Sequence, residues 1–271
     1  MVPLSGGRMD TLPLILVMNR RRDVARWQQI STALHALDLP CHRIRAVDAQ
    51  QHWALVRRCL PQSCCASALG RPLSPGEYGC ALSHIAALRR VLRSQAPSAI
   101  LLEDDATFDQ RFKELVTEAL PRFLRHCDIV KLEGLAYAYT STSGARVAFS
   151  HGLDLIVPLR PPLGSAAYAV TQAGARRLLA TFAALSDPLD HMLVAYERHR
   201  IPYAETRPFV VWQGVFPSTI TRDPSALSGS RASPAPPLPR IRHQRLYRGL
   251  VRMGLAARVI ARARLRTLFQ W

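Results

Sequence analysis

A short apolar run that ends in three acids, Ile100–Asp105 (ILLEDD), narrows the choice of fold. Its branched apolar residues indicate a strand that is buried on both faces of a parallel sheet. The carboxylates that follow cannot join that core, because burying unpaired charge costs a large free energy. We therefore place them at the carboxyl end of the strand, where open α/β sheets bind their ligands.

The three consecutive carboxylates of Glu103, Asp104 and Asp105 also suggest a chemistry. They repel one another unless a cation joins them. Hard divalent ions such as Mg²⁺ and Mn²⁺ choose oxygen ligands, which they often share with substrate phosphates. One interpretation is therefore a site for a metal and a diphosphate. The other is a solvated acidic turn that caps the next helix, and the residues alone leave both open.

Composition limits the class of protein. The 271 residues are 48% apolar, which suits one large α/β domain or two small ones. Lysine and arginine number 36 against 19 acids, and this excess predicts anionic partners such as nucleotides, acidic lipids or nucleic acids. Six cysteines do not indicate an extracellular disulfide framework, and Cys59, Cys64 and Cys65 lack the spacing of a zinc site. No apolar run approaches the ~20 residues of a membrane span, so we expect a cytoplasmic protein.

The chain opens with the pattern of a β-α-β unit, which implies a right-handed crossover. Leu12–Met18 predicts the first strand, a helical spacing of apolar residues follows, and Cys41–Val47 predicts the second strand. Arg20, directly after the first strand, is a candidate ligand for phosphate. Asp48, after the second strand, could accept ribose hydroxyls as in dinucleotide folds or simply form a turn.

A long helix is predicted to begin near residue 75. Ser74–Glu77 is a capping box with proline at the first helical position, so we interpret Glu77 as a cap and not as a catalyst. His84 lies beside the buried face of this helix. A single histidine in such a place is most often structural.

Two later segments place further charge near strand and helix ends. Asp128–Gly134 predicts a strand whose Lys131 and Glu133 point to the same side, where they could simply pair. Asp187 fits the N-cap of a later helix and Asp190 fits its third position, so capping is the simplest interpretation of both.

The C-terminal part of the chain differs in composition. We expect a catalytic domain over residues 1–222, a linker rich in Pro, Ser and Ala over 223–239, and a helical tail over 240–271. Arginines recur at helical spacing in the tail, while Leu246, Leu250, Met253, Ala257 and Ile260 occupy another face. Such a basic amphipathic helix could lie on an anionic membrane surface; the alternative is a solvated or packed helix.

Taken in order, these segments resemble glycosyltransferase family 25, the bacterial lipooligosaccharide galactosyltransferase group with animal collagen-type relatives. The likeness spans roughly residues 12–215. Leu189 and His191 depart from the usual motif around Asp190, and the basic tail has no counterpart in the family. The matching segments are Val17–Arg20 with Asp23 and Arg26, Ala46–Asp48, Leu73–His84, Ile100–Asp105, Asp128–Gly134, Gly164–Tyr168 and Pro188–Asp190.

The resemblance implies a GT-A-like fold, which is a Rossmann-type, mostly parallel sheet with helices on both faces. It implies transfer of a hexose, galactose in the first instance, from a UDP-sugar to a saccharide or lipid-linked glycan acceptor of lipopolysaccharide or lipooligosaccharide, with inversion at the anomeric carbon. Asp104 and Asp105 would hold Mn²⁺ or Mg²⁺. Asp190 is the candidate base, with Glu133 as second choice. The expected donor contacts are Asn19, Arg20, Asp48, His84, Glu103 and Lys131.

Two other classes of protein compete with this interpretation. A metal-dependent nucleotidyl or phosphoryl transferase also uses clustered acids, but the sequence contains no Gly-x-x-x-x-Gly-Lys-Ser/Thr phosphate loop. A basic nucleic-acid-binding protein would explain the arginines, but no recognised module or interleaving of aromatic and basic residues supports it. We therefore expect no nucleic-acid partner, and a cytoplasmic enzyme that is peripheral on the inner membrane face if the tail binds lipid.

Overall fold

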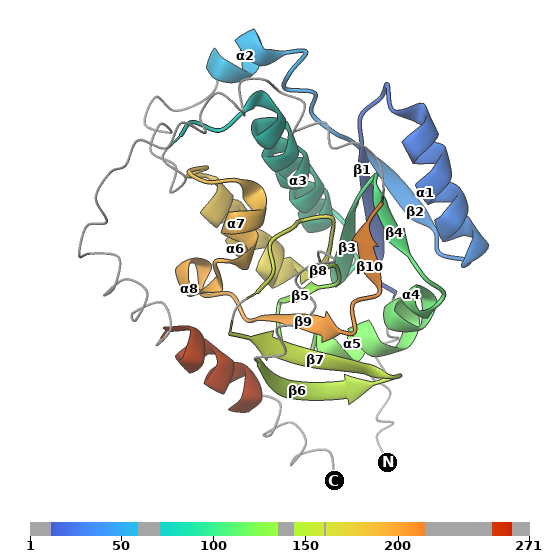
Figure 1. Ribbon diagram of the computed structural model, residues 1–271, viewed down its shortest axis with the longest axis vertical. Helices are drawn as coiled ribbons and strands as arrows, with labels where there is room; N and C mark the ends of the chain where they lie inside the picture. The colour runs from blue at the N-terminus through green and yellow to red at the C-terminus, as the bar shows by residue number, and fades with distance from the viewer. Residues whose placement is uncertain (1–11, 59–70, 135–143, 160, 215–250, 262–271) are drawn as a thin grey trace, which may run out of the picture.

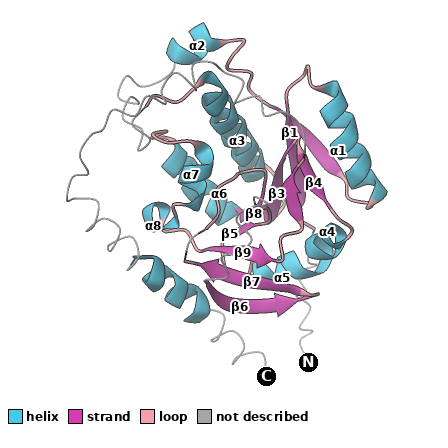
Figure 2. Ribbon diagram, viewed as in Figure 1, coloured by secondary structure: helices cyan, strands magenta, loops and turns pink. Residues whose placement is uncertain are grey.

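The computed structural model describes residues 12–58, 71–134, 144–159, 161–214 and 251–261 (Figure 1). Outside these residues lie the expected linker, all of the tail except residues 251–261, and Cys59, Cys64 and Cys65. The described chain forms one eight-stranded sheet between two layers of helices (Figure 2). The α/β class with helices on both faces is thus confirmed.

The strands follow the order β2-β1-β3-β8-β5-β9-β7-β6 across the sheet. A separate antiparallel pair, β4 and β10, lies beside it. The strands are β1 (Leu14–Asn19), β2 (Cys41–Arg45), β3 (Ser98–Glu103), β4 (Ala106–Phe108), β5 (Ile129–Lys131), β6 (Gly144–Ser150), β7 (Leu153–Pro158), β8 (Ala167–Thr171), β9 (Tyr203–Arg207) and β10 (Val211–Gln213).

The expected mostly parallel sheet is wrong, because the observed sheet is mixed. β1 pairs in parallel with β2 and β3, and β5 pairs in parallel with β9. β8 runs antiparallel to both β3 and β5, and β7 runs antiparallel to β6 and β9. A strand that is buried on both faces is apolar whichever way it runs, so its sequence does not reveal its direction.

Alternate residues of the central strands separate the core into two halves. Ile15 and Val17 pack with α1, α4, η1 and α5, whereas Leu16 and Met18 pack with α2, α3, α6, α7 and α8. The helices are α1 (Val24–Ala36), α2 (Trp53–Arg58), α3 (Pro75–Arg93), α4 (Arg111–Glu114), η1 (Leu115–Ala119), α5 (Leu120–Phe123), α6 (Gln172–Phe182), α7 (Leu189–Val194) and α8 (Tyr196–His199).

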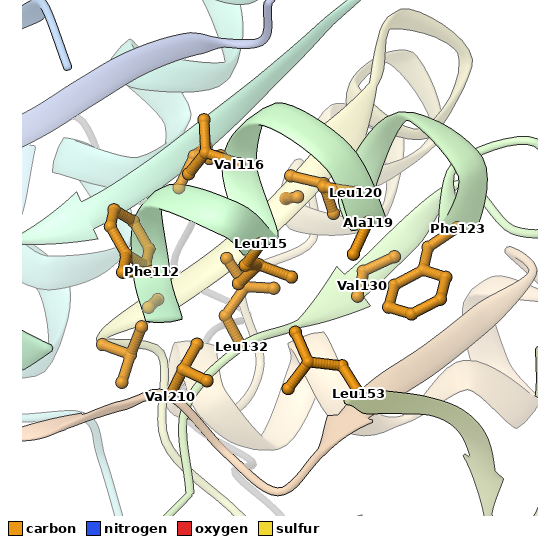
Figure 3. Close-up of a cluster of buried hydrophobic side chains, with 14 of the residues drawn as sticks. Phe112, Leu115, Val116, Ala119, Leu120, Phe123, Val130, Leu132, Leu153 and Val210 are labelled. Carbon is orange, nitrogen blue, oxygen red and sulfur yellow. The ribbon is translucent and has the colours of Figure 1, made fainter. Parts of the chain in front are cut away.

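The segment α4-η1-α5 covers one face of the sheet with large apolar side chains. Phe112 and Phe123 lie over the strands that carry Val130 and Leu153 (Figure 3). The middle of this segment, η1, is a π-helical turn. Pro121 follows it, and proline has no N–H for the helical ladder and clashes with the carbonyl four residues earlier, so a wider turn at this point accommodates it.

The capping box that begins α3 is confirmed. The Ser74 hydroxyl accepts a hydrogen bond from the Glu77 backbone N–H, and the Glu77 carboxylate accepts one from the Ser74 backbone N–H. Arg71 pairs with the same carboxylate at 2.7 Å. Farther along, the Ser83 hydroxyl accepts from the Val47 backbone N–H at 2.8 Å, which ties α3 to the loop after β2. These contacts fix the helix from which Cys80 and His84 project.

Residues 251–261 of the tail are helical and dock on the domain. Leu255, Ala256 and Val259 are buried against the core, while Met253 is 52% exposed. Arg252 pairs with Glu197 at 3.1 Å. Within the described residues, no helix is both long and apolar enough to cross a bilayer.

Candidate active site

The parallel strands β1, β2 and β3 bring their carboxyl ends to one edge of the sheet, and a pocket opens there. Helix α3 forms another wall of this pocket. Of the site residues that the sequence predicts, Arg20, Asp48, His84, Glu103, Asp104 and Asp105 all line it, together with Arg26 and Cys80.

Asp104 is held by two donors from the first β-α unit. Asn19 Nδ2 donates to Asp104 Oδ2 at 2.6 Å, and Arg26 Nη1 lies 3.0 Å from Asp104 Oδ1. Arg43 donates to the other end of the Asn19 amide, which fixes its orientation. Burial raises the pKa of Asp104, although Asn19 and Arg26 oppose that rise. Asn19 thus orients a carboxylate in the described structure.

Asp105 is the least satisfied carboxylate of the pocket. Its Oδ2 lies 3.7 Å from Arg26 Nη1, and its buried Oδ1 has no hydrogen-bond partner in the structure as described. Burial and the charges of Glu103 and Asp104 raise its pKa to about 7. A buried acceptor without a donor is costly, and a divalent cation would relieve both that cost and the repulsion. The residues present therefore fit a hard metal ion.

Glu103 is oriented by neighbours from three elements. Its Oε1 accepts from the Ser165 hydroxyl at 2.6 Å and lies 3.3 Å from Nε2 of His84. The other ring nitrogen of His84, Nδ1, lies 3.1 Å from the Tyr168 hydroxyl. Burial alone would raise the pKa of Glu103, but the hydrogen bonds and charges of His84, Ser165 and Lys131 lower it. Glu103 therefore stays ionised, and His84 is a partner of the acidic cluster.

Lys131 and Glu133 form a buried ion pair and do not line the pocket. Lys131 Nζ lies 2.5 Å from Glu133 Oε1 and donates to the Gly164 carbonyl at 2.6 Å. Both side chains are almost fully buried. Burial raises the pKa of Glu133, and the Lys131 charge opposes that rise. The expected pairing of these residues is confirmed; Lys131 acts on the site through its charge on Glu103.

Arg20 and Asp48 face the pocket, but each already has a local partner. Arg20 Nε lies 2.6 Å from Asp23 Oδ2 in an i,i+3 pair. Arg22 lies 2.9 Å from Asp48 Oδ2, and the Gln51 backbone N–H donates to Asp48 Oδ1 at 3.2 Å. A ligand in the pocket would therefore meet side chains whose positions are set before it binds.

Asp190 lies in the first turn of α7, where its Oδ1 accepts from the adjacent His191 N–H at 2.9 Å. Burial raises the pKa of the Cys80 thiol, and the Asp190 charge is near enough to add to that rise. The expected N-cap role of Asp187 is wrong. Pro188 occupies the cap position, and Asp187 pairs with Arg198 at 2.9 Å. A charge-assisted hydrogen bond to arginine stabilises this buried carboxylate more than a hydrogen bond from one backbone N–H would.

Several residues of the site received no role from sequence reasoning. Arg43, Ser165 and Tyr168 orient Asn19, Glu103 and His84 through hydrogen bonds. The small, β-prone residues of Gly164–Val170 predict a strand and belong to the family resemblance, but they assign no role to Ser165 or Tyr168. Arg43 lies in a strand with no pattern to mark it. Their roles depend on contacts across 24 to 84 residues of sequence, which only the fold creates.

The fold and the pocket define an α/β domain with a site of paired aspartates and arginines at the carboxyl ends of parallel strands. The chain belongs to glycosyltransferase family 25, because residues 13–193 match the model of that family, which is described as an LPS biosynthesis protein. The family implies a GT-A-like fold.

One relative extends this comparison. The chain is 27% identical over 197 residues to a probable inactive glycosyltransferase 25 family member 3 from Bos taurus. That match covers 66% of this chain but only 30% of the Bos taurus protein. The chain therefore aligns with less than a third of that relative.

Proposed function

We propose that this chain transfers a hexose, galactose in the first instance, from a UDP-sugar to a saccharide acceptor of lipopolysaccharide or lipooligosaccharide, with inversion. The observation that carries the proposal is the crowding of three carboxylates in the pocket, with the buried Oδ1 of Asp105 unsatisfied among the described residues. Family membership supports a nucleotide-sugar donor and a glycan acceptor.

Asp104 and Asp105 would hold the metal ion, Mn²⁺ or Mg²⁺. When bound, the metal supplies positive charge that stabilises the departing diphosphate. Asn19 holds Asp104 at 2.6 Å, so this ligand is oriented beforehand. Arg26 already lies between the two aspartates, where it can also bind a phosphate oxygen of the donor.

Asp190 is our choice for the base that removes the proton of the acceptor hydroxyl, because a base must reach its substrate. It is partly exposed in the first turn of α7. Glu133, the second candidate, is 1% exposed and lies 2.5 Å from Lys131 Nζ, so its lone pairs are engaged and far less accessible. A direct displacement with one base gives inversion at the anomeric carbon.

The matched Bos taurus protein is described as probable inactive, whereas we propose that this chain is active. The paired aspartates, their arginine and the open pocket of this chain support that activity. A donor screen tests it. Release of UDP from several UDP-sugars is measured with Mn²⁺ and a truncated lipooligosaccharide acceptor, and one UDP-hexose should be turned over well above the others. Absence of turnover with every donor and acceptor pair would contradict the proposal.

A further inference from the structure

A second group of metal-ligand side chains lies on the α3 side of the same pocket. Cys80 and His84 are four residues apart on α3, so they project from one face of the helix. Glu103 reaches them from the end of β3. The Cys80 sulfur, one ring nitrogen of His84 and one carboxylate oxygen of Glu103 all lie within 4.8 Å of one another, and all three residues line the pocket.

We propose that Cys80, His84 and Glu103 form a site for a borderline-soft transition metal, zinc in the first instance. This site differs from the aspartate pair in its chemistry, because a thiolate and an imidazole select Zn²⁺ over Mg²⁺ or Mn²⁺. It goes beyond the proposed transferase activity, since zinc binding requires neither a donor nor an acceptor.

The distances are close to those of a tetrahedral zinc centre. Bonds of about 2.0–2.3 Å place tetrahedral ligand atoms about 3.3–3.8 Å apart. His84 Nε2 and Glu103 Oε1 are 3.3 Å apart, and Cys80 Sγ and Glu103 Oε1 are 3.9 Å apart. The Cys80 sulfur lies within 4.8 Å of a His84 ring nitrogen, so a movement of Cys80 toward His84 would complete the triangle. Three protein ligands would leave the fourth position open toward the pocket.

The surroundings of the ligands also suit a metal. The Tyr168 hydroxyl lies 3.1 Å from His84 Nδ1 and can accept its N–H, which leaves the Nε2 lone pair for the ion. The Ser165 hydroxyl holds Glu103 Oε1 at 2.6 Å. When zinc binds, the S–H bond of Cys80 is replaced by a Zn–S bond and the thiol proton passes to solvent. No change of oxidation state is required.

Sharing of Glu103 couples this site to the aspartate pair. Zinc on Glu103 would place a second cation beside Asp104 and Asp105 and occupy part of the donor pocket. If the proposed transferase activity is correct, Zn²⁺ should therefore inhibit turnover that Mn²⁺ supports. That consequence rests on the proposed function, whereas zinc binding itself does not.

The test measures metal binding by the full chain without substrate. Cys59, Cys64 and Cys65 are first replaced by serine, so that their thiols cannot compete. Co²⁺ then serves as a spectroscopic probe, because its thiolate complexes absorb in the near ultraviolet, and Zn²⁺ affinity is measured by competition with a chromophoric chelator. We expect one thiolate-bound Co²⁺ per chain, with a band that Zn²⁺ abolishes and Mn²⁺ does not.

Four variants locate the site. Cys80→Ser should remove the thiolate band, and Tyr168→Phe, which keeps all three ligands, should weaken zinc binding about 10–100-fold. Cys41→Ser, which changes the half-buried thiol on β2, and Asp105→Asn should both keep the band. A missing band in the parent protein, or a band that survives in Cys80→Ser, would overturn the proposal. If Cys80→Ser fails to fold, unchanged zinc affinity in Tyr168→Phe would do the same.

Discussion

Asp105 shows how the fold can hold a single carboxylate in an unfavourable place. Its side chain is largely buried beside two other acids, and one of its oxygens has no donor among the described residues. Burial, together with Glu103 and Asp104, raises its pKa to about 7. Its ionisation therefore lowers the stability of the metal-free fold as pH rises from about 3.8 to 7, and a bound cation would remove that penalty.

Replacing Asp105 by Asn keeps the shape of the side chain and removes its charge. We expect transfer to fall by at least about 100-fold. The free energy of unfolding at pH 8 without metal should not decrease, because repulsion from Glu103 and Asp104 is lost. Steady-state UDP release and chemical denaturation measure the two effects. Asp109→Asn, which changes a half-buried partner of Arg111 outside the pocket, is the control and should remain active.

EDTA provides an independent test of the metal at the same residue. Chelation should stop transfer by the wild-type chain, and added Mn²⁺ should restore it. Full transfer in the presence of EDTA would remove the metal from the proposed mechanism, although the sugar-transfer reaction itself would stand.

Asp190→Asn separates a catalytic role from a local structural one. As the base, Asp190 should be needed only in the transition state, so kcat should fall strongly while the Kd for the donor stays near the wild-type value. As a helix-end residue, it should contribute about 1 kcal/mol of stability and little rate. Asp187→Asn, which breaks the ion pair with Arg198, should lower the melting temperature and leave kcat nearly unchanged. Full turnover in Asp190→Asn would exclude it as the base.

At the scale of elements, the loop that leads into β8 is shaped by the ion pair behind it. Gly164 has φ +112°, and its carbonyl accepts from Lys131. A Cβ at this residue would lie 2.2 Å from Glu133 Oε1. Gly152, in the turn between β6 and β7, also has a positive φ, but a Cβ there would meet nothing within 4 Å.

This pair of glycines gives a matched prediction. Gly152→Ala should lower the free energy of unfolding by about 1 kcal/mol, which is the cost of a left-handed backbone for a residue with a Cβ. Gly164→Ala should lower it by roughly 3 kcal/mol or more, since steric overlap with Glu133 is added to the backbone cost. Chemical denaturation of both variants checks the difference. Equal losses would mean that the Glu133 contact relaxes freely.

Strand β9 carries another buried acid. Glu205 is fully buried between Arg207, Lys131 and Glu133, and burial raises its pKa to about 7 despite Arg207 and Lys131. Because the folded pKa is above the unfolded value of 4.5, the folded state binds more protons between these pH values. Stability should therefore fall as pH rises from about 4.5 to 7, by roughly 3 kcal/mol from this residue.

Glu205→Gln should remove that part of the pH dependence. Denaturation midpoints measured between pH 5 and pH 8 should fall less steeply for the variant than for the wild type. Glu118→Gln, at an exposed position of η1, should keep the wild-type slope. A Glu205→Gln variant with the wild-type slope would assign the titration to another group.

At the scale of the whole molecule, the tail helix has two faces. Leu255, Ala256 and Val259 pack on the domain, while Met253 and Arg258 remain exposed. The packing face is not the predicted apolar face, to which Met253 and Ala257 belong. The exposed side of residues 251–261 therefore still combines apolar and basic groups, as an interfacial helix requires.

We expect the full chain to sediment with anionic liposomes at low salt, and a chain that ends at Pro239 to stay in solution. Because truncation also uncovers the docking surface, the sharper variant is Met253→Ser with Arg258→Gln, which should weaken sedimentation and leave the melting temperature unchanged. Arg252→Gln, which breaks the pair with Glu197, should instead lower the melting temperature. Equal sedimentation of the full and truncated chains would remove the membrane role.

The sequence by itself determined the features that depend on near neighbours. The apolar run of β3 and its acids, the capping box at Ser74 and the opening β-α-β unit follow from periodicity and local hydrogen bonding, and all are observed. The Lys131–Glu133 pair was also foreseeable, because residues two apart in a strand share a face. These features carry the resemblance to the family, and they identify most of the charged residues that line the pocket.

Only the tertiary structure decided the direction of β8, the existence of β9 and the partners of Asp187. β9 is not apparent in the sequence because Glu205 and Arg207 look exposed there. In the fold, Arg207 pairs with Glu205, and the charge of Lys131 also favours the buried carboxylate. Cys80, His84 and Glu103 likewise meet because a helix face and a strand end converge. Contacts between distant segments depend on strand order and direction, and hydrophobicity along a chain records burial but neither of these.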